Sequence, residues 1–185
     1  MEQRCFWVTD SKLYQDYHDF EWGVPVYDDD TLFEFLLLET FQAGLSWITI
    51  LNKRENFRAA FDDFDYQKIA KYSEFKYNEL LQDAGIIRNK LKIRSAITNA
   101  QLFIEIQKEH GSFSKYIWGF VNHEPVINKF HSKQDVPATT PLSDTISKAL
   151  KKKGFKFVGS TVMYAFMQAI GMVNDHTTNC FKYPN

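Results

Sequence analysis

Hydrophobic residues recur at helical spacing through most of the chain, whereas the strict alternation that predicts a strand is scarce. Residues 31–41 are almost continuously apolar and predict a buried helix. Apolar residues three or four positions apart predict further helices over 77–83, 90–110, 113–121, 143–153 and 158–170. The pattern therefore predicts an all-α fold, in which the proline-containing loop 128–141 separates two helical lobes around a cleft.

Length and composition predict one globular domain spanning residues 1–185. The 185 residues are 44% hydrophobic and 24% charged, which is typical of a folded chain rather than a disordered one. The formal net charge of -1 excludes a uniformly basic coat for nucleic acid but allows a local basic face. Aromatic residues make up 16% of the chain, more than a core of this size needs, and this leaves flat apolar surface for a pocket.

Nothing in the sequence predicts export or membrane insertion. The start of the chain lacks the continuous apolar core of a secretory signal, and no apolar run approaches the ~18 residues that cross a bilayer. Two cysteines are too few for a disulfide framework. We therefore expect a cytoplasmic protein without a membrane partner.

The two cysteines lie near opposite ends of the chain, and each has a histidine on its own side. Cys5 is followed by His18, and His176 is followed by Cys180 four positions later, on the same face of a helical turn. Two thiolates and two imidazoles are the ligand set of a closed, structural zinc site. The spacing alone leaves open the alternative of two free cysteines and two unrelated histidines.

Residues 80–90 connect two predicted helices through Gly85, a residue that can adopt the backbone conformation of a tight turn. The start of the following helix carries a partial positive charge that suits a phosphate. Arg88, Lys90, Lys92 and Arg94 cluster there. The segment resembles a helix-hairpin-helix with Ile87 in place of the second glycine, although most turns of this kind between helices are ordinary turns. A second basic run, over residues 148–156, is either part of a DNA-binding face or a solvated helix surface.

Aromatic residues and one carboxylate predict a pocket in the first quarter of the chain. Three of the four tryptophans occur there together with two tyrosines, namely Trp7, Tyr14, Tyr17, Trp22 and Trp47. Glu39 lies on the apolar stripe of the predicted helix 31–41, where a lone carboxylate is costly without a partner. Either a structural hydrogen bond or salt bridge satisfies it, for example with an arginine, or it binds a ligand in an enclosed pocket. Glu34 is the weaker candidate because it lies toward the helix edge.

Several short blocks resemble the 3-methyladenine DNA glycosylase I family and run nearly from end to end. They are Tyr17-His18-Asp19, Glu21-Trp22-Gly23-Val24-Pro25, Gln42-Ala43-Gly44-Leu45-Ser46-Trp47, Phe120-Val121-Asn122, Gly154-Phe155-Lys156-Phe157-Val158-Gly159 and Asp175-His176 with Cys180. The resemblance implies an all-α, helix-hairpin-helix glycosylase fold with helical lobes around a base-binding cleft. It also implies one structural zinc ion that joins the termini, with the ligands Cys5, His18, His176 and Cys180.

The resemblance also assigns roles to residues. Glu39 corresponds to the pocket glutamate that recognises the alkylated adenine, and it is the one catalytic candidate. Tyr17 and Trp47 correspond to residues that bind and stack on the base. The other pocket aromatics are Trp7, Tyr14 and Trp22. Gly44 and Leu45 correspond to the segment that fills the gap in the duplex, and the backbone-binding element contains Gly85, Arg88 and Lys90.

The implied activity is the flipping and hydrolytic excision of 3-methyladenine from double-stranded alkylated DNA. Free 3-methyladenine and an abasic site are the products, and we expect a monomer. Asn89 aligns with the superfamily's Schiff-base lysine, and no Asp occurs from 84 to 134, which predicts a monofunctional enzyme. The rival hypothesis is a non-catalytic, zinc-stabilised module that binds damaged DNA. Glu39 favours the enzyme, because a binding module needs no buried acid.

Overall fold

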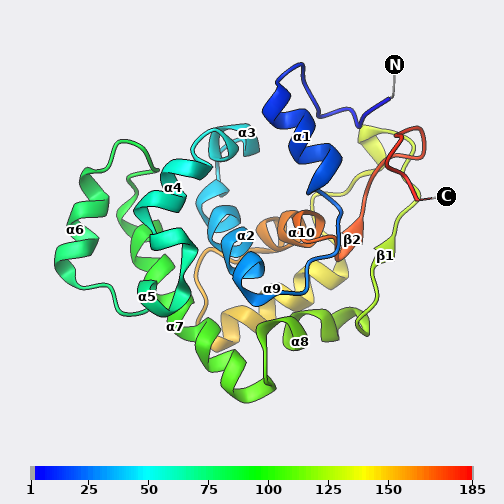
Figure 1. Cartoon of the computed structure of the whole chain (residues 1–185). Coiled ribbons are helices and arrows are strands. Elements are labelled where there is room, and N and C mark those ends of the chain that lie inside the picture. The colour runs from blue at the N-terminus through cyan, green and yellow to red at the C-terminus, as the bar shows by residue number, and fades with distance from the viewer. Residues whose placement is uncertain (1–2, 185) are drawn as a thin grey trace.

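A computed structural model describes residues 3–184 as an arrangement of helices with two very short strands (Figure 1). The α-helices are α1 (Lys12–Phe20), α2 (Asp29–Gln42), α3 (Trp47–Leu51), α4 (Arg54–Ala60), α5 (Tyr66–Ile69), α6 (Glu74–Gln82), α7 (Lys90–His110), α8 (Phe113–Trp118), α9 (Pro141–Lys153) and α10 (Ser160–Ala169). Three-residue 3₁₀ helices cover Asp62–Phe64, Gly119–Val121 and Lys133–Asp135. The predominance of helix confirms the fold class expected from the periodicity.

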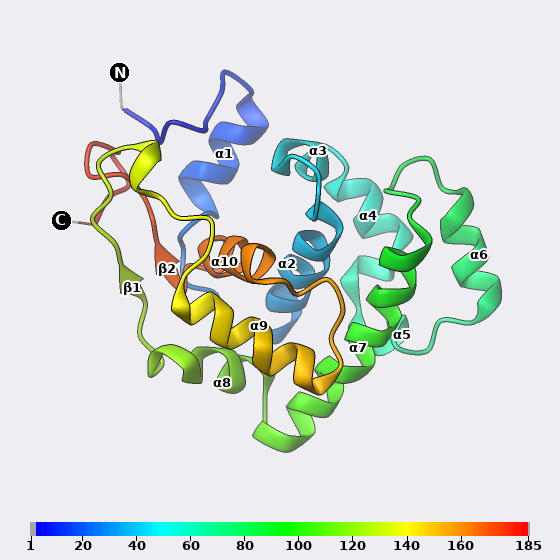
Figure 2. The ribbon, with the colours of Figure 1, turned by 180° about the vertical axis from the view of Figure 1, so that it is seen from behind.

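Helix α2 is the centre of the molecule. Every residue from Leu32 to Phe41 is buried, as the almost continuous apolar run predicts, and the burial includes Glu34 and Glu39. Helices α3, α7, α8 and α10 all pack against α2. The N-terminal segment, α1 and the C-terminus lie at one end of the molecule, and α4 to α7 lie at the other (Figures 1 and 2). The two ends of the chain are therefore neighbours in space.

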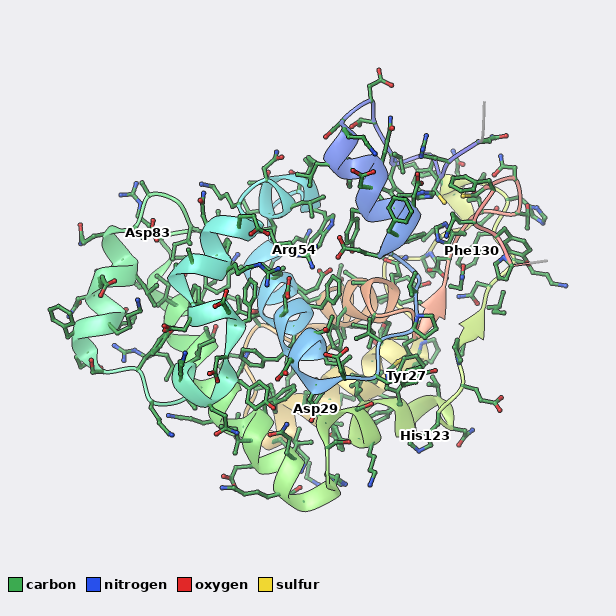
Figure 3. All side chains as sticks on the ribbon, viewed as in Figure 1. Tyr27, Asp29, Arg54, Asp83, His123 and Phe130 are labelled. Atoms are coloured by element: carbon green, nitrogen blue, oxygen red, sulfur yellow. The ribbon has the colours of Figure 1, made fainter. Side chains whose placement is uncertain are left out.

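Helix boundaries follow from side chains that satisfy the first backbone N–H groups. Asn89 accepts from the N–H groups of Leu91 and Lys92, and Gly111 ends α7 in the left-handed conformation, so α7 spans the predicted 90–110. The predicted helix 31–41 begins two residues earlier because Asp28 caps α2. Its neighbour Asp29 caps α8 instead, accepting from the N–H groups of Phe113 and Ser114 at 2.9 and 2.8 Å (Figure 3).

Two connections were not expected from the sequence. Strand β1 (Val126–Ile127) pairs in parallel with β2 (Val173–Asn174), which joins the middle of the chain to its C-terminal segment. At Gly171 the chain passes so close to residues 24–25 that a Cβ atom would lie 2.3 Å from the carbonyl carbon of Val24, so only glycine fits there. These contacts hold the segment between α1 and α2 against the end of α10.

Among the described residues, no helix is both long enough and apolar enough to cross a bilayer.

Candidate functional site

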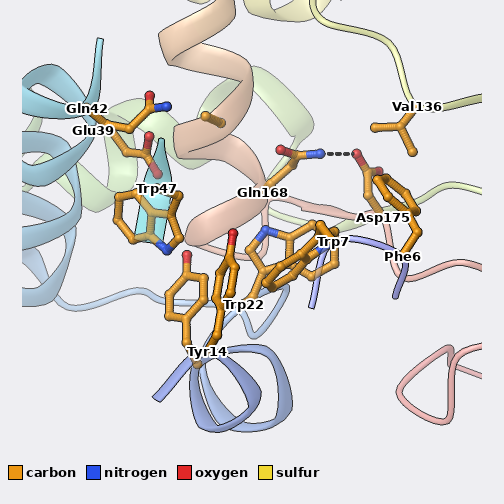
Figure 4. Close-up of a pocket in the computed structure, with 12 residues that line it drawn as sticks. Phe6, Trp7, Tyr14, Trp22, Glu39, Gln42, Trp47, Val136, Gln168 and Asp175 are labelled. Atoms are coloured by element: carbon orange, nitrogen blue, oxygen red, sulfur yellow. Dashed lines mark hydrogen bonds between the residues drawn. The ribbon is translucent and has the colours of Figure 1, made fainter. Parts of the chain in front are cut away.

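A cavity of about 230 Å³ lies between α1, the second half of α2, α3 and α10 (Figure 4). It is lined by Phe6, Trp7, Tyr14, Tyr17, Trp22, Glu39, Gln42, Trp47, Val136, Ala165, Gln168 and Asp175. All five aromatic residues singled out in the sequence are in this set, and so is Glu39. The structure therefore brings the predicted pocket residues together, from three helices and the N-terminal segment.

The aromatic residues form a continuous wall. The rings of Trp7 and Trp22 lie 5.0 Å apart between centroids, and those of Trp7 and Tyr14 lie 4.9 Å apart. Tyr17 and Trp47 follow at 5.3 Å. Tyr17 is buried and next to Glu39, and burial together with the neighbouring acids raises the pKa of its hydroxyl well above the usual value. The wall thus offers flat faces and a neutral phenol to a ring-shaped ligand.

Two polar atoms of this cavity are buried and have no hydrogen-bond partner within residues 3–184. They are Oε2 of Glu39 and the indole nitrogen Nε1 of Trp47. Burial raises the pKa of Glu39 to about 8, because a charged carboxylate loses its hydration there. Buried polar atoms are nearly always paired in native proteins, so two unpaired ones in one cavity indicate a polar ligand.

Of the two explanations for Glu39, the structural one is wrong as far as a salt bridge is concerned. Among the described residues Glu39 forms no ion pair, and the nearby arginine serves Glu34 and Glu21 instead. Arg54 donates from Nε to Glu34 at 2.6 Å and from Nη1 to Glu21 at 2.7 Å (Figure 3). Arg58 adds a bond to Glu34 at 2.9 Å. Glu34 is therefore fully engaged in a structural network, in agreement with its weaker ranking.

The predicted metal ligands form a buried cluster beside the cavity. The candidate ligand atoms of Cys5, His18, His176 and Cys180 all lie within 4.8 Å of one another. Sγ of Cys180 is 3.4 Å from Nε2 of His18 and 3.5 Å from Nδ1 of His176, and Sγ of Cys5 is also 3.5 Å from Nδ1 of His176. Neighbouring ligands of a tetrahedral zinc ion are about 3.6 Å apart, given the usual bond lengths. The separations therefore suit such an ion.

The outer nitrogens of both histidines are fixed. Nδ1 of His18 lies 2.7 Å from Asp19, whose carboxylate is gripped by Arg4. The Arg4 guanidinium and His18 lower the pKa of Asp19 to about 2. Nε2 of His176 lies 3.1 Å from the carbonyl oxygen of Trp22. Each imidazole therefore directs its other nitrogen toward the thiols, which is the arrangement found around bound metals.

The turn after α2 lies at the edge of the cavity. Gly44 has a φ of +80°, and nothing lies within 4 Å of where its Cβ would be. The side chain of Leu45 is partly exposed, and Nε2 of Gln42 donates to its carbonyl oxygen at 2.7 Å. The turn therefore presents an apolar side chain to solvent on a backbone that Gln42 holds in place.

The turn between α6 and α7 differs from the expectation in one respect. Gly85 is not in the left-handed region, so the predicted reason for a glycine there is wrong. A Cβ atom at Gly85 would lie 3.0 Å from Oδ1 of Asp83 and 3.1 Å from Cβ of Asn56, so close packing is the reason instead. Lys53 donates to the carbonyl oxygens of Ala84 and Gly85 at 3.3 and 3.2 Å.

Only part of the basic cluster near this turn is available to a ligand. Arg88 and Lys90 are exposed, as a phosphate contact would require. Lys92 is buried, and its ammonium bonds to backbone carbonyls of the α2 end. Arg94 is paired with Glu74 at 2.6 Å. In the second basic run, Lys153 is paired with Glu109.

Several lining residues were missed by the sequence reasoning. Asp175 is buried and accepts three hydrogen bonds, from Tyr164 at 2.5 Å, Asn128 at 2.7 Å and Gln168 at 2.8 Å. Gln42 and Asp175 lie within blocks that carried the family resemblance, which was a usable signal. No sequence signal distinguishes Gln168 or Ala165 from other residues of an amphipathic helix.

Comparisons with known proteins agree with one another. The family model "Methyladenine glycosylase" matches residues 7–183. The chain is 50% identical over 182 residues to DNA-3-methyladenine glycosylase 1 of Escherichia coli, covering 98% of this chain and 97% of that one. A crystal structure of 3-methyladenine DNA glycosylase I superimposes with a TM-score of 0.96 at 51% identity, covering 98% of this chain and 100% of that one. A variant of 3-methyladenine DNA glycosylase I in complex with 3-methyladenine gives a TM-score of 0.93 at 34% identity, with 96% and 95% covered.

Proposed function

The chain belongs to the methyladenine glycosylase family, and we propose that it excises 3-methyladenine from alkylated double-stranded DNA. The base would leave the stack, enter the aromatic cavity and be released as free 3-methyladenine, which leaves an abasic site. The observation that carries this proposal is the unpartnered Oε2 of Glu39, buried at an aromatic wall. A damaged adenine supplies what this cavity lacks, because it is flat, cationic and bears an exocyclic amine.

The cavity favours the damaged base through its charge. An adenine methylated at N3 is cationic while bound to the sugar, whereas normal adenine is neutral. Aromatic faces attract a desolvated cation by about 2 kcal/mol, and a carboxylate adds a charge-assisted hydrogen bond to the amine. Binding of the cation would also favour the ionised form of Glu39, which releases its proton to solvent, because an opposite charge lowers a carboxyl pKa that burial has raised. We assign base recognition to Glu39, Tyr17 and Trp47, with Trp7, Tyr14 and Trp22 completing the wall.

The bond to the sugar is weak once the base is cationic, because the base leaves without taking up a proton. As the glycosidic bond breaks, positive charge moves from the base to the sugar, and Glu39 stabilises this charge in the transition state. Water attacks the anomeric carbon and loses a proton to the solvent. Asn89, which aligns with the superfamily's Schiff-base lysine, caps α7 and is occupied by two backbone N–H groups. These features support a monofunctional enzyme that does not cut the strand.

DNA contacts follow from the two exposed turns. We propose that Leu45, on the turn with Gly44, enters the duplex where the base has left. Gly85, Arg88 and Lys90, in the turn that leads into α7, would contact the phosphate backbone as a degenerate helix-hairpin-helix, because exposed basic residues bind phosphate and the dipole of α7 adds positive potential there. The cavity draws on residues from Phe6 to Asp175, which supports one glycosylase domain over 1–185 that acts as a monomer. We place this activity in the cytoplasm, where the DNA of the bacterial relatives lies.

We further propose that the cluster of Cys5, His18, His176 and Cys180 holds one zinc ion. The donor set and its spacing fit a closed tetrahedral site. The Cys5 thiol and both histidines lower the pKa of Cys180, whereas the same thiol pairing and burial raise the pKa of Cys5, so zinc would have to displace the proton of the Cys5 thiol. Such an ion supplies cross-linking rather than reaction chemistry. It would join residue 5 to residue 180 and thereby brace the Trp7 and Trp22 rings, which lie 5.3 and 4.8 Å from His18 and His176.

The test is incubation of the protein with methylated duplex DNA and identification of the released bases. We expect release of 3-methyladenine, with 7-methylguanine retained and the strands intact. Glu39→Gln keeps the shape but removes the charge, and should slow single-turnover release about 100-fold or more, as loss of a group that stabilises transition-state charge does. The matched control is Glu124→Gln, which changes an exposed carboxylate. A folded parent protein that binds abasic DNA but releases no base would establish the non-catalytic module instead.

A further inference from the structure

Lys92 is a buried lysine without a carboxylate partner among the described residues. Its side chain is 6% exposed, and burial lowers its pKa. The ammonium donates to the carbonyl oxygen of Phe41 at 2.7 Å and to that of Ala43 at 2.6 Å. These carbonyls are at the C-terminal end of α2, where the helix dipole is negative and backbone acceptors lack helical partners.

The position of Lys92 connects two elements that the proposed function assigns to DNA. Its own backbone N–H is bonded to the Asn89 cap, so it belongs to the first turn of α7, next to the exposed Arg88 and Lys90. Its ammonium bonds to the residue directly before Gly44 and Leu45. One side chain therefore bridges the phosphate-binding turn and the turn that would enter the duplex.

Lys92 caps the end of α2, but a cap does not have to come from α7. Lysine side chains bond to the last carbonyls of helices, and removing a buried charge from its partners is destabilising. Water or a glycine in the left-handed conformation would satisfy the same carbonyls without a buried charge. What a lysine adds is a directional link of fixed length between α7 and the residue before Gly44.

We infer that Lys92 is a positioning residue that fixes the Gly44–Leu45 turn relative to the start of α7, so that backbone binding and insertion of Leu45 occur in register. The inference rests on the proposed function and extends it. Lys92 does not line the cavity, and its burial keeps it from contacting DNA directly. It acts through its hydrogen bond to the carbonyl oxygen of Ala43.

The experiment is a double-mutant cycle on single-turnover excision, with Lys92→Met and Leu45→Ala made singly and together. If Lys92 acts by placing Leu45, Lys92→Met slows excision about tenfold in the parent but less than about twofold in the Leu45→Ala background, since coupled residues are not additive. Affinity for free 3-methyladenine, followed by tryptophan fluorescence, should stay within about twofold because the base cavity is unchanged. Lys108→Met is the matched control, since it makes the same change at an exposed site near the other end of α7.

Other outcomes overturn the inference. Equal slowing in both Leu45 backgrounds would mean that Lys92 acts elsewhere, and a parallel loss of free-base affinity would mean that it merely holds the fold. Should Lys92→Met not fold, Lys92→Gln keeps a shorter, uncharged donor, and it must slow excision in the parent while having less than about a twofold effect in the Leu45→Ala background. A parent protein that releases no base overturns the proposed function as well, whereas a parent that excises and a Lys92→Met variant of equal rate overturn the inference alone.

Discussion

The cavity and the Cys/His cluster are neighbours built from adjacent residues, yet they treat buried polar atoms in opposite ways. Tyr17 faces the cavity and His18 the cluster, from consecutive positions of α1. In the cluster, every imidazole nitrogen has a contact, to a thiol on one side and to Asp19 or the Trp22 carbonyl on the other. In the cavity, Glu39 and Trp47 each keep a buried polar atom without a partner.

The difference separates a site organised for stability from one organised for a ligand. Polar groups that the chain satisfies by itself lower the energy of the fold whether or not a substrate is present. Unpaired buried polar groups destabilise the fold while the site is empty. A ligand that pairs with them restores the missing hydrogen bonds, and this gain contributes to its recognition. The cluster therefore supports the wall of a cavity in which two buried polar atoms, on Glu39 and Trp47, lack partners.

The largest effect should come from breaking the cluster. His176→Ala removes one candidate zinc ligand, which contacts both thiols, so the proposed metal and the cross-link between the two ends of the chain are lost. We expect unfolding free energy to fall by about 4–5 kcal/mol, as is typical when a structural metal is lost, with a decrease of about 10 °C or more in Tm. Thermal unfolding and metal content measured on the same samples test this. His123→Ala, at an exposed histidine, should change neither.

The opposite sign is expected in the cavity. Glu39 has a pKa of about 8 in the folded chain, above the ordinary value of 4.5. The folded state therefore binds the proton more tightly, and stability falls as pH rises from about 4.5 to about 8. Glu39→Gln should remove this dependence and stabilise the protein by about 2–4 kcal/mol at pH 8, with little gain near pH 4.5. Urea unfolding at both pH values measures this, with Glu124→Gln as the control. A difference in unfolding free energy between Glu39→Gln and the parent that is the same at both pH values would contradict the prediction.

A smaller effect is expected when the outer contact of one histidine is altered. Asp19→Asn weakens the hydrogen bond that orients His18 and removes the charge held by Arg4. Loss of such an outer contact lowers metal affinity about 10–100-fold. Competition with a chelator of known affinity measures it, and Asp16→Asn, elsewhere on α1, serves as the control. An unchanged affinity would show that Asp19 serves Arg4 alone.

The smallest effect concerns the pH dependence of catalysis. The substrate cation has a fixed charge, so Glu39 is the group whose ionisation should control the encounter. Because kcat/KM reports the free enzyme, it should fall about tenfold for each pH unit below the Glu39 pKa of about 8 and level off above it. Glu39→Gln should abolish this limb and leave a low, flat profile. A parent profile that is flat from pH 6 to 9 would contradict the assigned role.

Local sequence was sufficient for much of the fold. Helix α7 begins at the asparagine cap and ends at a left-handed glycine, both visible as residue types, and its predicted span is the observed one. The almost continuous apolar run of α2 identified the central helix, because apolar residues on every side of a helix leave no side that favours solvent. The short strands β1 and β2 had no such signal, since a two-residue strand has no period and its pairing is decided by distant residues.

The sequence by itself also determined the chemistry available at the site: a carboxylate in an apolar run, an excess of aromatic rings, and two Cys/His pairs. Only the tertiary structure decided which groups are satisfied. Arg54 pairs with Glu34 rather than with Glu39. Lys92 is buried against the end of α2, and Gln168 and Asp175 line the cavity. Periodicity reports which face of a helix is buried, because that depends on neighbours three or four positions away. The residues that pack against this face lie tens of positions away in the sequence. They also decide whether a buried carboxylate is paired, as Glu34 is, or left without a salt bridge, as Glu39 is.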